Sequence, residues 1–108
     1  MEDVSKELVF SDGMFTLIKK TMIRYDGHQF VDFQISCIDE IDRYKVSVII
    51  INENSNTTPN YRIVVCHERD KFFSFRETAE YISIIEKALQ FAMRVKKYMI
   101  EYGYMVIE

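Results

Sequence analysis

The feature that most constrains the fold is one long stretch of helical periodicity in the last third of the chain. Ser74-Phe75-Arg76-Glu77 matches a capping box, in which the first side chain accepts from the amide of the fourth residue and the fourth side chain reaches back. Gly103 follows the last periodic turn and suits the left-handed position that ends a helix. These signals predict a helix over about residues 75–102, followed by a short tail at 104–108.

The preceding two thirds of the chain are typical of β-strands. Strand-like runs occupy residues 14–25, 31–37, 44–50 and 61–67, the second and third with a clear period of two. Short turn signals separate the runs, so successive strands are expected to pair as antiparallel neighbours. We predict a single domain, 1–108, with strands over about 6–67. Its fold class is α+β: an antiparallel β-meander of four to five strands packed against one long C-terminal helix in two layers.

Asp26-Gly27 lies between two of these runs and predicts a tight turn. The pair is the strongest short signal for a two-residue type I′ hairpin, in which both residues take positive φ. In that register Tyr25 pairs with His28, so position n pairs with position 53 − n. The face opposite the core then carries Phe15, Leu17, Ile23 and Phe30. Either a bulge shifts the register and removes this oddity, or the apolar face meets a partner.

The predicted helix is more apolar than one sheet requires. Its polar sector is only about 100° wide, whereas an apolar stripe of little more than 100° is enough for packing on a sheet. We expect the core side to contain Tyr81, Ile82, Ile85, Ala88, Leu89, Ala92, Val95, Met99 and Ile100. A second stripe is left over: Ile84, Phe91, Tyr98 and Tyr102. Either a curved sheet or the N-terminal segment covers it, or it forms a homodimer or partner interface.

The sequence carries no arrangement of residues typical of catalysis. No glycine-rich phosphate loop, zinc-type cysteine pair or nucleophile elbow occurs. His28 and His67 are far apart and lack matched ligands, so neither a metal nor another cofactor is expected. Three carboxylates crowd one acidic turn and are expected to contact a basic partner: Asp39, Glu40 and Asp42. The chain is therefore expected not to be an enzyme.

Charge and composition restrict the partners and the compartment. The net charge of −3 over 108 residues argues against general electrostatic binding to nucleic acid or to anionic membranes. The N-terminus lacks a basic-then-apolar signal pattern, so a cytoplasmic protein without membrane association is expected. Cys37 and Cys66 are expected to be reduced thiols rather than a disulfide.

Surplus apolar surface on a small acidic chain favours a protein-binding role. We expect a module that occludes or bridges a protein partner and forms a homodimer, such as an inhibitor or accessory factor that a phage or mobile element directs at a basic, nucleic-acid-handling host protein. The predicted partner-binding residues are Ile84, Phe91, Tyr98, Tyr102, Phe15, Leu17, Ile23 and Phe30, with Asp39, Glu40 and Asp42 as acidic contacts. The alternative is a single-stranded nucleic-acid-binding protein that uses an aromatic and basic sheet face, including Lys19, Arg24, Arg43, Lys45 and Arg62.

Overall fold

The computed structural model describes residues 2–53, 60–68 and 73–105, with side chains from residue 5 onward. In chain order the elements are β1 (Glu2–Ser11), β2 (Phe15–Ile23), β3 (Gln29–Cys37), α1 (Asp39–Asp42), β4 (Ser47–Asn52), β5 (Tyr61–Cys66) and α2 (Phe75–Glu101). All strand pairs are antiparallel, in a three-stranded sheet β1-β2-β3 and a two-stranded sheet β4-β5. The predicted α+β class, with strands packed on one long C-terminal helix, is confirmed. The predicted tail beyond residue 105 lies outside the described residues.

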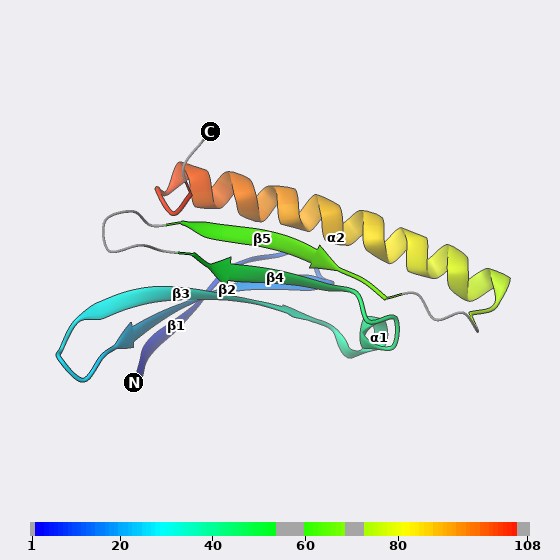
Figure 1. Cartoon of the computed structure of the whole chain (residues 1–108). Coiled ribbons are helices and arrows are strands. Elements are labelled where there is room, and N and C mark those ends of the chain that lie inside the picture. The colour runs from blue at the N-terminus through cyan, green and yellow to red at the C-terminus, as the bar shows by residue number, and fades with distance from the viewer. Residues whose placement is uncertain (1, 54–59, 69–72, 106–108) are drawn as a thin grey trace.

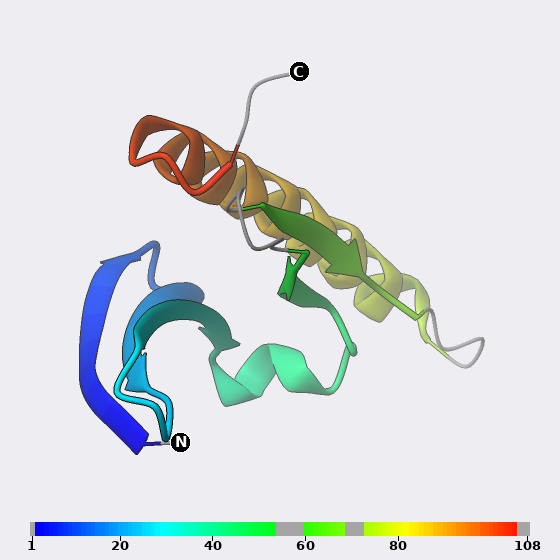
Figure 2. The ribbon, with the colours of Figure 1, turned by 60° about the vertical axis from the view of Figure 1, so that its left-hand side comes forward.

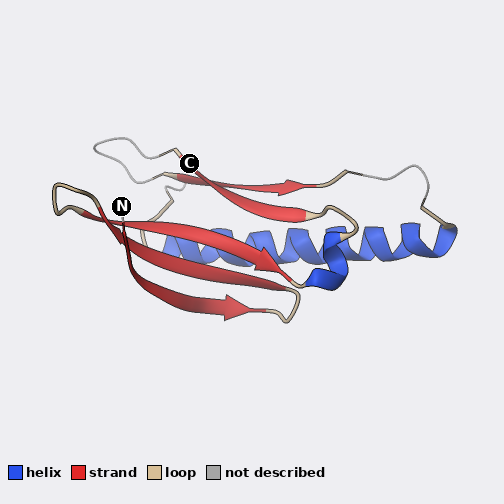
Figure 3. Ribbon diagram, turned by 90° about the horizontal axis from the view of Figure 1, so that it is seen from below, coloured by secondary structure: helices blue, strands red, loops and turns tan. Residues whose placement is uncertain are grey.

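Helix α2 runs lengthwise along the strands and contacts both sheets (Figure 1). Figure 3 shows β3 and β4 side by side at a seam, although the two strands belong to separate hydrogen-bonded ladders. The Tyr61 hydroxyl in β5 donates to the Val31 carbonyl in β3 at 2.6 Å and so bridges the seam. Both sheets therefore depend on the same helix for cover.

The core lies between α2 and the sheets and is rich in aromatic rings. Phe91 of the helix is 1% exposed, and its ring centroid lies 5.3 Å from that of Phe10 and 5.6 Å from that of Phe15. At the seam, Phe33 of β3 packs edge-on against Tyr61 of β5 at 5.4 Å. The buried residues of α2 form one stripe at spacings of three and four: Tyr81, Ile84, Ala88, Phe91, Val95 and Met99.

The β2–β3 hairpin differs from its predicted register by one residue. Lys19 pairs with Phe33, one position from its expected partner, because the loop has three residues, 25–27. The Gly27 amide donates to the Arg24 carbonyl at 3.0 Å, and among the loop residues Gly27 alone takes positive φ, at 85°. This geometry is a type I turn followed by a left-handed glycine, which the Asp-Gly pair suits as well as it suits type I′. The predicted two-residue turn is wrong.

The register shift exchanges the two faces of β2. Phe15 and Leu17 share a face with Phe33 and Ile35 and point into the core, where both are fully buried. A shift of one residue moves a whole strand face from one side of a sheet to the other. Of the two alternatives that the sequence left open for this face, the shifted register is therefore correct.

Strand β1 bends strongly around the edge of the first sheet (Figure 2). Its pairing with β2 shifts at residues 4 and 9, and each shift is a bulge that increases local twist. The second bulge leaves Phe10 on the core face, where it meets Phe91. The guanidinium of Arg94 lies 4.4 Å from the centre of the Phe10 ring and covers it from outside.

Helix α1 takes the place of the turn predicted around Asp39. Its Ile41 is buried, and Tyr44 and Val46 also enter the core before β4 begins at Ser47. The predicted strand over 44–50 is wrong in its first three residues, because this connection crosses from one sheet to the other. Lys45, with φ of 52°, makes the bend.

Both ends of α2 carry the caps that the sequence predicts. The Ser74 hydroxyl accepts from the Glu77 amide at 3.1 Å, and the Glu77 carboxylate accepts from the Ser74 amide at 3.5 Å. At the other end Gly103 takes φ of 80°, and the Tyr104 amide donates to the Met99 carbonyl at 2.7 Å. The helix therefore begins at a capping box and ends in a Schellman motif.

We expect Phe91→Ala to destabilise the protein by about 3–5 kcal/mol, because it removes a fully buried ring and leaves a cavity between the helix and β2. Urea unfolding followed by circular dichroism measures the loss. Phe75→Ala is the matched control: Phe75, at the start of the same helix, is 95% exposed, so its truncation should change the free energy of unfolding by at most about 0.5 kcal/mol. Similar losses in both variants would mean that α2 packs with another face inward.

The capping contacts also give Glu77 a pH-dependent role. Hydrogen bonds with the Ser74 side chain and backbone, and the Arg43 guanidinium at 2.6 Å, hold the pKa of Glu77 below its usual value of 4.5. A lowered pKa in the folded state stabilises that state above pH 4.5, and the contribution disappears as the pH falls through the folded value.

The urea midpoint of Glu77→Gln should therefore lie below that of the wild type at neutral pH, and the two should converge as the pH falls below 4.5. Glu68→Gln removes an exposed carboxylate that lies outside the capping contacts and corrects for the general effect of lost charge. A gap between Glu77→Gln and the wild type that stays constant at low pH would contradict this role.

Candidate functional site

The helical stripe predicted to bind a partner is the core face of α2. Ile84 and Phe91 are buried, and Tyr98 is half-buried among rings of β3 and of the chain after the helix. Tyr102 is the exception, because it lies at the end of the helix with 64% of its surface exposed. The prediction is corrected accordingly: the core of this chain takes up three of the four side chains.

The predicted binding residues of the strands do not form one surface either. Phe15 and Leu17 lie in the core as a result of the register shift. Ile23 is half-buried near the loop end of β2. Phe30 is half-buried on the opposite face of the sheet, where the Arg24 guanidinium lies 5.3 Å from its ring centre.

The acidic turn lies in α1 and acts on its own neighbourhood. Asp39, Glu40 and Asp42 are all exposed. The thiol of Cys37, at the end of β3, has its pKa raised above the usual 9.0, first by burial and then by the charges of Asp42 and Asp39. A raised pKa lowers the fraction of this thiol that is thiolate at neutral pH and so slows its reactions.

A different apolar stripe of α2 faces solvent. At 100° per residue it lies beside the buried stripe. Its members, which we call the outer stripe, are Ile82, Ile85, Leu89, Met93, Lys96 and Ile100. Three of them are exposed large apolar side chains: Met93 at 72%, Ile82 at 52% and Leu89 at 49%. The helix thus presents apolar surface on two sides, and the core uses one of them.

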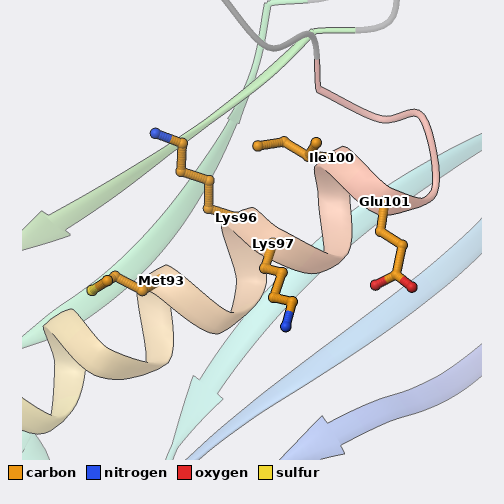
Figure 4. A pocket seen from close by; sticks show the side chains of 5 residues that line it. All are labelled: Met93, Lys96, Lys97, Ile100 and Glu101. Atoms are coloured by element: carbon orange, nitrogen blue, oxygen red, sulfur yellow. The ribbon is translucent and has the colours of Figure 1, made fainter.

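A shallow groove marks the C-terminal half of the outer stripe (Figure 4). Its lining residues are Met93, Lys96, Lys97, Ile100 and Glu101. Lys96 and Ile100 extend to one side of the helix and Lys97 and Glu101 to the other, with the strands passing behind. The aliphatic part of a lysine side chain is apolar, so the floor of the groove is apolar while its rim is charged.

The polar contacts around the start of α2 connect the helix to the segments before it. Arg43 pairs with Glu77 at 2.6 Å, and the His67 Nδ1 lies 2.7 Å from the Tyr81 hydroxyl. Within residues 2–53, 60–68 and 73–105, no three metal-ligating side chains come together to hold an ion. In the same ranges, no helix combines the length and the apolar character needed to cross a bilayer.

The outer stripe is the part of the molecule that sequence reasoning missed. Helical periodicity places Ile82, Leu89 and Ile100 in the core, but the structure turns these residues toward or partly toward solvent. A usable signal is nevertheless present in the sequence. The buried stripe carries no charged residue from Tyr81 to Met99, whereas the outer stripe contains a lysine.

Comparison with known proteins assigns no family to this chain. No family model matches it, and no match was found among curated proteins or among solved structures.

Alkylation of Cys37 tests the influence of the acidic turn. Asp42→Asn removes one charge that raises the pKa of this thiol, so its reaction with iodoacetamide should become about twofold faster. Burial, the larger cause, is unchanged and limits the gain. Peptide mass spectrometry reports the rate at Cys66 in the same sample as an internal reference. An unchanged rate at Cys37 would contradict the influence of the turn.

Proposed function

We propose that this chain is a non-enzymatic protein-binding module that acts by occluding or bridging its partner, with the outer stripe as the binding surface. The observation that carries the proposal is the exposure of Ile82, Leu89 and Met93 along one side of α2. A contiguous apolar surface on a folded domain typically marks a place where another protein binds. The group that matches it best is an amphipathic helix, whose own apolar residues recur at spacings of three and four.

The helix that carries the outer stripe is well suited to this role. Its ends are fixed by the capping box at Ser74 and by the left-handed Gly103, so the stripe is ordered before a partner arrives. Binding to a preorganised surface costs less conformational entropy than binding to a mobile one. Charged residues of both signs flank the stripe, among them Glu86 and Lys97, and give the surface electrostatic specificity.

Single-stranded nucleic-acid binding through the sheet has less support. Two of the five basic side chains on which it depends already have acidic partners in the chain. The Arg62 Nε lies 3.2 Å from the Glu53 carboxylate. Arg43 pairs with Glu77. A phosphate backbone would have to compete with these carboxylates for the same cations.

Photocrosslinking at the outer stripe tests the proposal. A benzoylphenylalanine in place of Leu89 should form adducts with a protein in the cells that make this chain, because residue 89 lies near the middle of the stripe. The control carries the same group in place of Tyr25, which is 98% exposed in the β2–β3 loop. Adducts should be at least about tenfold more abundant from position 89 than from position 25. Equal labelling from the two positions would contradict the proposal.

A further inference from the structure

We infer that the helix bound by the outer stripe is α2 of a second copy of this chain, packed antiparallel about a twofold axis at the level of position 91. The inference rests on the proposed function and names its partner. A twofold interface needs a surface that is complementary to itself. If residue i of one copy contacts residue j of the other, then residue j of the first copy also contacts residue i of the second. The outer stripe meets this need in its spacing, its shape and its charges.

The apolar residues of the outer stripe are spaced symmetrically about position 91. In an antiparallel pair centred on position 91, Ile82 lies opposite Ile100 of the second copy, and Leu89 lies opposite Met93 of the second copy. Symmetry repeats each contact, so apolar pairs extend along the whole stripe. Association buries the most apolar surface at the exposed residues, since Ile82 and Leu89 have 52% and 49% of their surface in solvent in the single chain.

The groove of Figure 4 has the shape that accepts one side chain from a facing helix. Its walls include Met93 and the residues three, four and seven positions after it, which are Lys96, Lys97 and Ile100. In knobs-into-holes packing, four residues with this spacing surround one knob. In the register centred on position 91, Ile85 of the second copy lies opposite Lys97 and enters the hole.

The charges favour the antiparallel orientation. In the same register Glu86 lies opposite Lys96 of the second copy, and symmetry makes this contact twice. Neither side chain forms an ion pair with another residue that the structure describes. A parallel pair would set Glu86 against Glu86 and Lys96 against Lys96, and would also align the two helix dipoles. A second copy therefore satisfies the apolar and the charged residues together.

Charge exchange at this pair tests both the partner and the orientation. Sedimentation equilibrium of the wild type should give a mass approaching twice the 12.9 kDa of the chain at about 100 µM. Lys96→Glu replaces two attractive contacts with two repulsive ones and should raise the dimer dissociation constant about tenfold or more. The double variant Glu86→Lys/Lys96→Glu should return it to within about threefold of the wild type. Lys87→Glu, the same change on the polar side of the helix, should leave it unchanged.

Leu89→Glu provides an independent variant with a charge inside the apolar contact. It should be monomeric at every concentration tested, while its circular dichroism and thermal midpoint stay close to those of the wild type because residue 89 is half exposed in the single chain. A monomeric wild type at about 100 µM overturns the inference. A dimer that persists in Leu89→Glu, or that the double variant fails to restore, overturns it as well.

These results are distinguishable from failure of the proposed function. A monomeric chain that still crosslinks a different protein from position 89 would leave the binding surface in place and remove the second copy as its occupant. The absence of any adduct from position 89 would remove both. An adduct between two copies of the chain would support both.

Discussion

The packing of one uncharged stripe of α2 against the strands is the interaction on which the rest of the structure depends. Phe91 lies within it and links β1 to β2 through Phe10 and Phe15. The two sheets share no hydrogen-bonded ladder, and a two-stranded ladder such as β4-β5 is marginal by itself. One helix therefore supplies the common cover for the five strands that the structure describes, and its rotation about its own axis decides which side chains are inside.

The same rotation decides what remains outside. The helix is apolar over more of its circumference than two small sheets can cover, so turning Ile84 and Met99 inward leaves Ile82, Leu89 and Met93 outward. The apolar surface in excess of what the core covers is thus present, but it lies mainly on the helix and on a different side from the one expected. Both proposals use the outer stripe because it combines exposure with the order that two helix caps impose.

Features set by residues within one helical turn of each other could be predicted from the sequence. Features that depend on which face of a strand or helix is buried could not. Ser74 and Gly103 fix the ends of α2 through hydrogen bonds to near neighbours, so a local pattern was sufficient. The Asp26-Gly27 pair fits two loops that differ by one residue, and the burial of Phe15 goes with only one of them. The candidate site was missed for a similar reason, because a helix that is apolar on two sides does not reveal by periodicity which side packs on the sheets.

The order of the elements has a consequence for the synthesis of this protein. The strands that the structure describes all precede α2, so the ribosome releases both sheets before the helix that covers them has been made. The aliphatic run at residues 48–51 in β4 stays without its cover until α2 has emerged. Uncovered strands of this kind aggregate readily. Folding of the two sheets is therefore delayed until α2 has emerged from the ribosome.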